Sequence, residues 1–286
     1  MQKLLFTKMS GAGNDFVFLD EKENLGLSIS NELVKKLCNR KTGIGADGLI
    51  VIKDKKDFDF EMQYYNSDAT TNTLCGNGAR CSIKFAKDTK RISSKDVKFL
   101  SNNLAYTGSV LEDELIRFDF MSPNKIKLNF KVKATNQLIT SNFVDTGSPH
   151  LVIKIGDVLS ESKKIKSNYD NISEFPVYEL GKEIRNLPEF SPGGTNVNFI
   201  KIIDDKVHIR TFERGVENET LACGTGSVAS AIIANLVDGL KPPVTLVTKS
   251  GEQLIVDFKK NNYEFNKVSL TGPAKTMFIG EYFLNL

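Results

Sequence analysis

Two cysteines stand at the start of glycine-rich turns, and small residues that favour helices follow each turn. The two stretches are Cys75-Gly76-Asn77-Gly78-Ala79-Arg80-Cys81 and Ala222-Cys223-Gly224-Thr225-Gly226-Ser227. The first turn of a helix leaves backbone N–H groups unpaired and carries the positive end of the helix dipole. A thiol at such a place ionises more easily, and the same N–H groups can hold an anion. The repeated motif therefore predicts two thiols that act on one anionic substrate.

A pair of thiols suits proton transfer at a carbon centre. One thiolate removes a proton from one face of the carbon while the other thiol delivers a proton to the opposite face, and the configuration inverts. The neighbouring backbone N–H groups would stabilise a carboxylate that gains negative charge in the transition state. The alternative is a reversible disulfide between Cys75 and Cys223. Folding would have to bring these two residues together, since the chain has no Cys-x-x-Cys pair.

The composition is that of a globular protein of 286 residues, a length that suggests two domains. The formal net charge is +3, from 38 Lys and Arg against 35 Asp and Glu, and no long basic run occurs, so nucleic-acid binding is not expected. No apolar run approaches the ~18 residues that span a bilayer. The apolar stretch near the N-terminus is too short for a signal peptide. We therefore expect a cytoplasmic protein without a membrane partner.

The other cysteines and the two histidines do not form a metal-binding pattern. The spacing of a zinc site is missing, so we expect no metal and reduced thiols. Cys38 falls on the apolar face of a helix predicted over residues 31–38, and Cys81 falls inside the helix that follows Cys75. Both are expected to be packing residues. Taken alone, His150 is expected to be a structural hydrogen-bonding group.

Strands are predicted around both cysteine motifs. Residues 3–9 and 16–19 would flank a turn in which Asn14 takes a positive φ, if that turn is an ordinary glycine hairpin. Apolar clusters and alternating patterns predict the other strands. These cover residues 49–52, 58–65, 98–100, 105–111, 114–120, 127–133, 142–145, 151–155, 207–212, 244–248, 253–258 and 267–270. A further aromatic-aliphatic strand is predicted directly after the glycine turn that carries Asn196.

The order of parts repeats in the two halves of the chain. A glycine turn with an asparagine comes first, then a strand that ends in a polar residue, and then the cysteine turn and its helix. The matched residues are Asn14, Asn66 and Cys75 in one half and Asn196, Glu213 and Cys223 in the other. Such repetition predicts two similar domains that face one another, with the site in the cleft between them.

Four motifs together resemble those of the diaminopimelate epimerase family. They occur in the family's order along nearly the whole chain: Ser10-Gly11-Ala12-Gly13-Asn14-Asp15-Phe16, Thr42-Gly43-Ile44-Gly45-Ala46-Asp47-Gly48, the Cys75 motif, and Glu213-Arg214-Gly215 with the Cys223 motif. The resemblance implies an α+β fold of two pseudo-symmetric domains, each a mostly antiparallel β-sheet or barrel wrapped round a central α-helix. Residues 1–121 plus 272–286 would form the N-terminal domain that carries Cys75. Residues 122–271 would form the C-terminal domain that carries Cys223.

The resemblance also implies an activity and the residues that perform it. The protein would be an isomerase that interconverts LL- and meso-diaminopimelate without PLP or any other cofactor, on the route to lysine and peptidoglycan precursors. Cys75 and Cys223 would be the acid/base pair and exchange roles with the direction of reaction, and His150 and Glu213 would tune their pKa values. A homodimer is implied as well, and the apolar tail around Phe278 is expected to be either its surface or an edge strand. The implied substrate-binding residues are Asn14, Asn66, Gly76, Asn77, Asn196, Glu213, Arg214, Gly224 and Thr225.

Some positions depart from the family's usual pattern. Ser148 stands where many members have asparagine, and Gly48 stands where some members have glutamine. Both are still expected to contact substrate, Ser148 through a shorter side chain and Gly48 through its backbone. The turn over residues 66–70 and the loop between Glu213 and Cys223 also differ from the family's usual sequence and length. These differences bear on the range of substrates that the protein accepts.

Two other functions remain open. A proline or hydroxyproline epimerase of the same fold would also use two cysteines, although Asn77 with Glu213 and Arg214 favours the larger, doubly zwitterionic substrate. A non-catalytic redox sensor would use Cys75 and Cys223 as a reversible disulfide.

Overall fold

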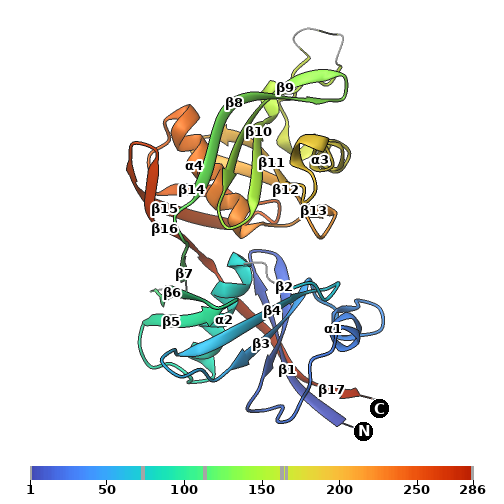
Figure 1. The fold of residues 1–286 in the computed structure, drawn as a ribbon, viewed down its shortest axis with the longest axis vertical. Helices are drawn as coiled ribbons and strands as arrows, with labels where there is room; N and C mark the ends of the chain where they lie inside the picture. Colours follow the sequence, from blue (N-terminus) through green and yellow to red (C-terminus); the bar gives the residue numbers. More distant parts are fainter. Residues whose placement is uncertain (1, 72–74, 112–114, 162–163, 165–166, 285–286) are drawn as a thin grey trace. The chain divides into compact units, whose positions relative to one another are not determined.

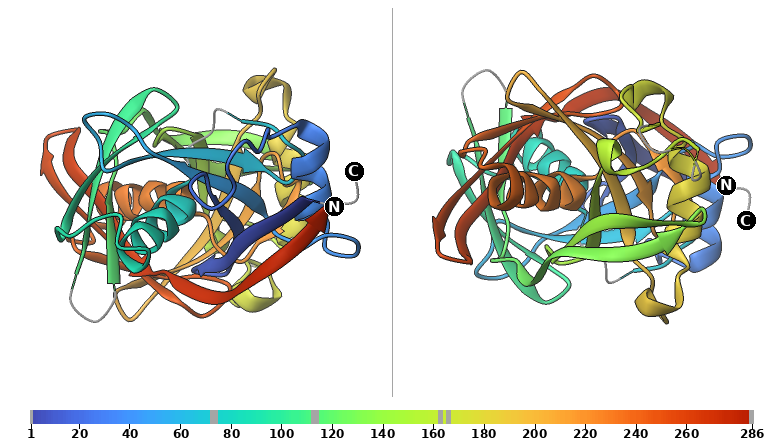
Figure 2. Two further views of the ribbon diagram at one scale, coloured as in Figure 1. Left: turned by 90° about the horizontal axis from the view of Figure 1, so that it is seen from below. Right: turned by 90° about the horizontal axis from the view of Figure 1, so that it is seen from above.

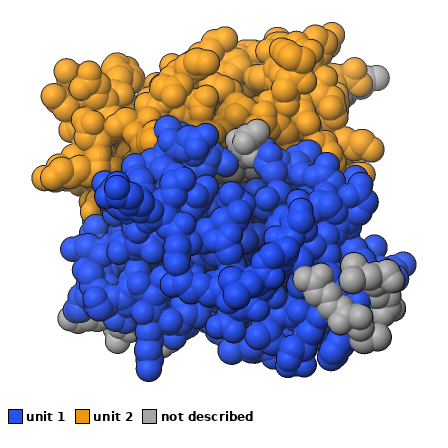
Figure 3. All heavy atoms as spheres, turned by 60° about the horizontal axis from the view of Figure 1, so that its bottom comes forward, with its two compact units in different colours: residues 1–119, 271–286 blue, residues 120–270 orange. Residues whose placement is uncertain are grey.

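Contacts between α-carbons divide the chain into two compact units (Figures 1 and 3). The computed structural model describes residues 2–71, 75–111, 115–161, 164 and 167–284. One unit comprises Met1–Asp119 together with Thr271–Leu286, and the other comprises Phe120–Leu270. The domain boundaries predicted from the sequence fall after residues 121 and 271, close to these unit boundaries. Residue 114, in the strand predicted over 114–120, lies outside the described residues.

The first unit is built on one mixed sheet. Its strands lie in the order β17-β1-β2-β3-β4-β5-β6-β7, with parallel β2–β3 and β4–β5 ladders and antiparallel ladders elsewhere. The bounds are β1 (Gln2–Gly11), β2 (Asn14–Asp20), β3 (Gly48–Lys53), β4 (Phe60–Asn66), β5 (Asp96–Ser101), β6 (Leu104–Val110), β7 (Leu115–Asp119) and β17 (Lys275–Leu284).

The second unit has a sheet of the same kind. Its strands lie in the order β8-β9-β10-β11-β12-β14-β15, with parallel β10–β11 and β12–β14 ladders and antiparallel ladders elsewhere. The bounds are β8 (Asn124–Ala134), β9 (Gln137–Asp145), β10 (Pro149–Lys154), β11 (Asn196–Ile203), β12 (Lys206–Glu213), β14 (Val244–Val247) and β15 (Gln253–Asn261). The short β13 (Asn218–Thr220) pairs with β12, and β16 (Glu264–Pro273) follows β15.

Each unit wraps its strands round one buried helix, as predicted. Helix α2 (Gly76–Asp88) contacts β1, β2, β3, β4, β6, β7 and β17, and α4 (Gly224–Asp238) contacts β9, β10, β11, β12, β14 and β15. Residues 76–83 of α2 and 224–234 of α4 are all buried. In α4 the buried residues are all small or apolar, which allows the helix to be enclosed, whereas α2 also buries the polar side chains of Asn77, Arg80 and Ser82.

The remaining helices are shorter and contact fewer strands. Helix α1 (Asn31–Cys38) packs on β3, and α3 (Val177–Arg185) packs on β8, β11, β12 and β13. The 3₁₀-helices are η2 (Ile155–Asp157), η3 (Ile172–Glu174) and η4 (Pro188–Phe190). Ser30 caps α1, since its side chain accepts a hydrogen bond from the backbone N–H of Leu33 at 3.2 Å.

The repetition predicted from the sequence is confirmed, but its register is different. β1 to β6 and β9 to β15 follow the same succession of ladders, with α1 and α3 after the second strand and α2 and α4 after the fourth. In this succession β11 corresponds to β3, so Asn196 corresponds to Gly48. The sequence-based match of Asn14 with Asn196 is wrong, because a glycine turn alone does not reveal which ladder the next strand joins.

Asn14 lies in a strand and not in the preceding turn, and the two cysteines expected to pack are buried. The turn between β1 and β2 places Ala12 (φ 57°) and Gly13 (φ 97°) in the left-handed region, whereas Asn14 begins β2, so the positive φ predicted for Asn14 is wrong. The packing roles predicted for Cys38 and Cys81 are confirmed, since both are buried. Burial raises the pKa of the Cys38 thiol to about 12.

The end of the chain returns to its beginning. β17 runs antiparallel to β1, with Gln2 opposite Leu284 and Ser10 opposite Lys275, and the two strands lie side by side in both views of Figure 2. The apolar tail is therefore a strand of the first unit.

We expect the contact between α3 and β12 to be intolerant of added volume. A methyl group on Gly181 would lie 2.4 Å from Cβ of Phe212. A contact this short belongs to the upper part of the range for overpacking, about 2–3 kcal/mol, whereas alanine gains only ~1 kcal/mol over glycine in a helix. Gly181→Ala should lower the free energy of unfolding by about 1–2 kcal/mol in urea titrations. Gly156→Ala is the control, because its methyl group would meet no described heavy atom within 4 Å; equal effects of the two variants would contradict this account.

Candidate functional site

Cys75 is the residue that begins α2. Its backbone is extended (φ −108°), and its Sγ accepts a hydrogen bond from the backbone N–H of Gly78 at 3.3 Å. The side chain is partly exposed. The predicted placement of this thiol at a helix start is confirmed, and an anion on sulfur would be stabilised there by the helix dipole.

Two predicted binding residues meet beside this helix start. The Asn77 amide Nδ2 donates to Asn14 Oδ1 at 2.5 Å, and Asn14 Nδ2 donates to Asp47 Oδ2 at 3.0 Å. Asn77 is buried, whereas Asn14 is partly exposed. The turn before β2 and the first turn of α2 are thus joined by a chain of side-chain amides that ends on a carboxylate.

Next to Asn14 lies a network of charged residues that were not predicted as site residues. Arg40 forms ion pairs with Asp15 at 2.6 Å and with Asp47 at 2.8 Å, and Lys8 forms one with Asp15 at 2.8 Å. Burial acts to raise the pKa of Asp15, but the hydrogen bonds and charges of Arg40 and Lys8 outweigh it and hold that pKa below its usual value. Asp47 belongs to the Thr42–Gly48 motif, and an acidic residue among glycines could have indicated from the sequence that it is part of the site.

Gly48 and Asn66 lie opposite each other on β3 and β4. A side chain at Gly48 would meet the ring of Tyr64 at 2.6 Å, so this position offers only backbone. The Tyr64 hydroxyl donates to Asn66 Oδ1 at 2.7 Å, and Asn66 Nδ2 donates to Thr70 Oγ1 at 2.8 Å. The tyrosine therefore occupies the space beside Gly48 and orients the asparagine.

In the second unit, Cys223 begins α4 as Cys75 begins α2. Cys223 is buried with an extended backbone (φ −125°), and its Sγ lies 3.4 Å from Thr225 Oγ1. Thr225 Oγ1 also lies 2.9 Å from Nε2 of His150, and the backbone carbonyl of Thr225 accepts from Thr146 Oγ1 at 3.0 Å. The structure thus connects His150 with Cys223 through Thr225.

His150 is enclosed at the start of β10. Burial, followed by the positive charge of Arg214, lowers the pKa of His150 from 6.5 to about 3. Above that pH the imidazole is neutral, so one ring nitrogen donates a hydrogen bond and the other accepts one. His150 is a structural hydrogen-bonding group, and it is also joined to a predicted catalytic thiol.

Asn196, Ser148 and Arg214 form a second group at the same end of the sheet. Asn196 Nδ2 donates to Ser148 Oγ at 2.9 Å and to the Pro149 carbonyl at 3.0 Å, and its Oδ1 accepts from the Arg214 backbone N–H at 2.9 Å. Both amide hydrogens of Asn196 are therefore used inside the unit. Its hydrogen bonds hold the loops that carry Ser148 and Arg214.

Glu213 is the last residue of β12 and is partly buried. Its Oε2 accepts from Thr220 Oγ1 at 2.9 Å. Asn196 lies next to the Val197–Phe212 pair of the β11–β12 ladder, so Glu213 and Asn196 lie at the same edge. Cys223 precedes Gly224 and Thr225 at the start of α4, and His150 is the second residue of β10, which pairs with β11.

Asn198 is a buried polar residue that the sequence analysis missed. It stands two residues after Asn196 on β11, and the period of a strand places both side chains on one face of the sheet. That spacing was the signal available in the sequence. Asn198 Nδ2 lies 3.0 Å from His150 Nδ1, which brings it into the same group.

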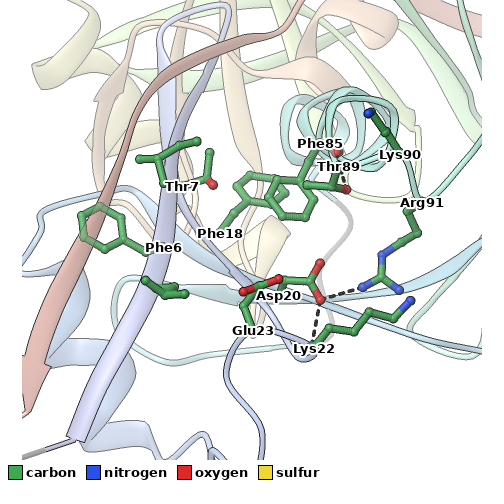
Figure 4. A pocket seen from close by; sticks show the side chains of 12 residues that line it. Phe6, Thr7, Phe18, Asp20, Lys22, Glu23, Phe85, Thr89, Lys90 and Arg91 are labelled. Carbon is green, nitrogen blue, oxygen red and sulfur yellow. Dashed lines mark hydrogen bonds and ion pairs between the residues drawn. The ribbon is translucent and has the colours of Figure 1, made fainter.

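A pocket of about 370 Å³ lies elsewhere in the first unit (Figure 4). Phe6, Phe18 and Phe85 form an apolar wall, and Arg91 forms ion pairs with Asp20 and Asp54 at its polar side. None of the predicted site residues lines this pocket. This pocket therefore does not mark the thiols, which stand at the two helix starts.

The described residues contain no group of three or more His, Cys, Asp or Glu arranged to hold a metal ion. All four cysteines lie in the described residues, and no disulfide joins them. Among the helices in the described ranges, none is both long and apolar enough to cross a membrane.

The buried, neutral His150 predicts a specific dependence of stability on pH. Between pH 6.5 and about 3 the unfolded chain binds a proton at this residue that the folded chain does not, so stability falls as the pH drops below 6.5. Lowering the pH from 7 to 5 should remove about 2 kcal/mol from the free energy of unfolding through His150 alone. We expect His150→Asn to lack this part of the loss in urea titrations, and His208→Asn to retain it. Equal pH dependence in wild type and His150→Asn would contradict the assignment.

Comparisons with known proteins identify the family of the chain. The sequence profile of the family described as Diaminopimelate epimerase matches residues 6–120 and 142–277. A diaminopimelate epimerase from Chlorobaculum tepidum is 38% identical over 275 residues, which cover 95% of this chain and 98% of that protein. A diaminopimelate epimerase from Aquifex aeolicus is 37% identical over 288 residues, which cover 96% of each.

Solved structures of lower identity share the fold. A phenazine biosynthesis protein of the PhzF family from Bacillus anthracis matches with a TM-score of 0.72 at 12% identity, covering 99% of this chain and all of that one. A hydroxyproline epimerase from Agrobacterium vitis with bound trans-4-hydroxy-L-proline matches with a TM-score of 0.69 at 13% identity, covering 98% and 92%. These likenesses show the two-domain α+β architecture alone. The family match and the identity to full-length relatives show more: the chain belongs to the diaminopimelate epimerase family.

Proposed function

We propose that this protein is an isomerase that interconverts LL- and meso-diaminopimelate, a step toward lysine and peptidoglycan precursors. The observation that carries the proposal is family membership along nearly the whole chain, combined with a thiol at the start of each central helix. The relatives are named for this activity, and each central helix of this chain begins at a cysteine.

In the proposed reaction Cys75 and Cys223 act as an acid/base pair on one α-carbon. The thiolate of one residue takes the α-proton, and the electron pair of the broken C–H bond moves toward the carboxylate. The thiol of the other residue then gives its proton to the opposite face, so the configuration inverts and the two sulfur atoms exchange protonation states. The reverse direction uses the same groups in exchanged roles.

The first turns of α2 and α4 are proposed to bind the reacting carboxylate. Backbone N–H groups of Gly76, Asn77, Gly224 and Thr225 would stabilise its growing negative charge, as oxyanion donors do. The side chains proposed to bind the rest of the substrate are Asn14, Asn66, Ser148, Asn196, Glu213 and Arg214, with Gly48 contributing backbone.

His150 and Glu213 are proposed to tune the thiols. The hydrogen-bonded path from His150 through Thr225 supports this role toward Cys223. Glu213 is partly buried and anchored by Thr220, which would hold its carboxylate near the end of β12.

The scheme requires no PLP, because the thiols move the proton and the helix starts stabilise the charge. We therefore expect hydroxylamine, which traps carbonyl cofactors, to leave the activity unchanged.

A cytoplasmic location also stays a prediction, which cell fractionation would check.

We propose that the protein acts as a homodimer through β17. Met277, Phe278 and Ile279 are exposed on this strand, with Ile279 75% exposed, and the Phe278 ring packs edge-on against Phe6. Clustered exposed apolar side chains are typical of surfaces that associate. A second copy of the chain would cover them.

The two-thiol scheme predicts that neither cysteine can be replaced. Cys75→Ala and Cys223→Ala should each lower inversion of LL-diaminopimelate, and deuterium incorporation from D₂O at its α-carbon, by about 1,000-fold or more, since general acid and base catalysis each supply large factors. NMR and chiral chromatography of the product measure both effects. Cys38→Ala is the matched control, since this buried cysteine belongs to the core cluster under α1 and should leave turnover intact. Full turnover by either site variant would overturn the scheme.

The same assay separates the rival functions. Wild type should turn over diaminopimelate and leave L-proline and trans-4-hydroxy-L-proline unchanged. Turnover of the cyclic substrates alone would favour an epimerase of that kind. Inactive reduced protein that forms a reversible Cys75–Cys223 disulfide would favour a redox sensor.

Dimerisation through β17 predicts a change of mass with one substitution. Ile279→Glu should convert a dimer into a monomer in sedimentation velocity at micromolar concentration, because the carboxylate would be buried in an apolar surface. Tyr263→Glu is the control, since Tyr263 is also exposed but lies in the second unit. A monomeric wild-type protein would contradict the proposal.

A further inference from the structure

A chain of buried polar side chains leads from the interior of the second unit to Cys223. Asn198 on β11 contacts His150 on β10, His150 contacts Thr225 in the first turn of α4, and Thr225 contacts Cys223. The distances are 3.0 Å from Asn198 Nδ2 to His150 Nδ1, 2.9 Å from His150 Nε2 to Thr225 Oγ1, and 3.4 Å from Thr225 Oγ1 to Cys223 Sγ. All these residues are buried, so water does not compete for their hydrogen bonds.

The surroundings of Asn198 determine the orientation of its amide. Asn198 Nδ2 lies 3.0 Å from the backbone carbonyl of Leu151, and its Oδ1 accepts from Thr211 Oγ1 at 3.0 Å. A carbonyl oxygen can only accept, so the NH₂ group must face Leu151. With the amide reversed, two oxygen atoms would lie in contact. The second hydrogen of the same NH₂ group then points to His150 Nδ1.

This orientation determines which ring nitrogen of His150 carries the proton. Because Asn198 donates to Nδ1, that nitrogen accepts, and in a neutral imidazole the proton must sit on Nε2. We infer that Asn198 is a positioning residue that fixes the Nε2–H tautomer of His150, so that His150 donates to Thr225 and the Thr225 hydroxyl donates to Cys223 Sγ. The lowered pKa of His150 is consistent with the neutral ring that this arrangement needs.

The direction of this chain matters for the thiol. Thr225 Oγ1 uses a lone pair to accept from His150 and has one hydrogen to donate. A thiolate can only accept, so the hydrogen from Thr225 stabilises the charged form of Cys223 over the neutral one. This catalytic role rests on the proposed function, in which the hydrogen-bond chain stabilises the thiolate of Cys223 so that it can act as the base.

Gly226 allows the chain to form. A side chain at this position would meet Asn198 Oδ1 at 2.4 Å and His150 Cε1 at 3.3 Å. The second glycine of the Cys223 motif therefore lets the first turn of α4 lie directly against both polar residues. In the first unit the corresponding strand positions hold Phe16 and Ile50, which cannot form hydrogen bonds through their side chains.

Charged residues lie near this chain on several strands. The positive charge of Arg214 acts on His150 and favours its neutral form. Glu213 precedes Arg214 at the end of β12, and Asp145 lies opposite Pro149, next to His150, in the β9–β10 ladder. Variants that leave these three residues in place therefore change the hydrogen-bond chain without changing the charge around it.

NMR of the intact protein labelled with ¹⁵N-histidine tests the tautomer. The chain has only two histidines, so His208→Gln assigns the signals. Wild type should show a protonated Nε2 and an unprotonated Nδ1 for His150. Asn198→Leu should produce a mixture of tautomers, whereas Asn142→Leu, which removes another buried asparagine, should not. A His150 protonated on Nδ1 in wild type would overturn the inference.

The rate of alkylation of Cys223 by iodoacetamide, resolved from the other cysteines by mass spectrometry, tests the effect on sulfur. Thr225→Val should lower this rate about tenfold at pH 7, because a hydrogen bond to a charged group is lost, and should leave the tautomer unchanged. Thr225→Ser should restore the rate. An unchanged rate in Thr225→Val would overturn the role of the hydroxyl, and it would do so even if Asn198→Leu failed to fold.

Neither measurement uses diaminopimelate. A protein with the Nε2–H tautomer and a Cys223 that responds to Thr225→Val, but without epimerase activity, would support this assignment and contradict the proposed function.

Discussion

The structure of each unit depends on a helix that is buried from its first residue and begins at a cysteine. Burial limits the access of water to the first turn, so the N–H groups there need acceptors from the protein or from a bound anion. In α2 the sulfur of Cys75 accepts one of them, from Gly78. A thiolate accepts hydrogen bonds far better than a neutral thiol does, and the helix dipole favours negative charge at this end. In α2 the hydrogen bond that caps the helix would therefore also stabilise a thiolate on Cys75, whereas Cys223 makes no such cap and contacts the Thr225 hydroxyl instead.

The sheets bring other polar residues to the same ends. In the first unit, the start of β2, the start of β3 and the end of β4 place Asn14, Gly48 and Asn66 at one edge. In the second unit the corresponding strands place His150, Asn196 and Glu213 at one edge. Because parallel and antiparallel ladders alternate in the same order in both units, a strand start and a strand end always lie beside the helix start. A repeated fold thus provides two similar settings for different side chains.

Local patterns in the sequence predicted the elements well. Alternation and apolar clustering gave the strands, and the cysteine motifs gave both central helices, because these signals depend on neighbours in the chain. The match of Asn14 with Asn196 was wrong because similar glycine turns precede strands that join different ladders. Asp47 and Asn198 were missed because each forms its hydrogen bond with a residue distant in sequence. Asp47 accepts from Asn14, and Asn198 contacts His150.

The sequence by itself determined where the two thiols stand and what surrounds them locally. A glycine turn that opens a helix is a short-range feature, so Cys75 and Cys223 could be identified from their own motifs. Only the tertiary structure decided which groups support them. Ladder register set His150 beside Asn196, the bare α-carbon of Gly226 let α4 approach Asn198, and the ring of Tyr64 filled the space beside Gly48. These contacts join residues far apart in the chain, and their geometry arises from packing that no local pattern encodes.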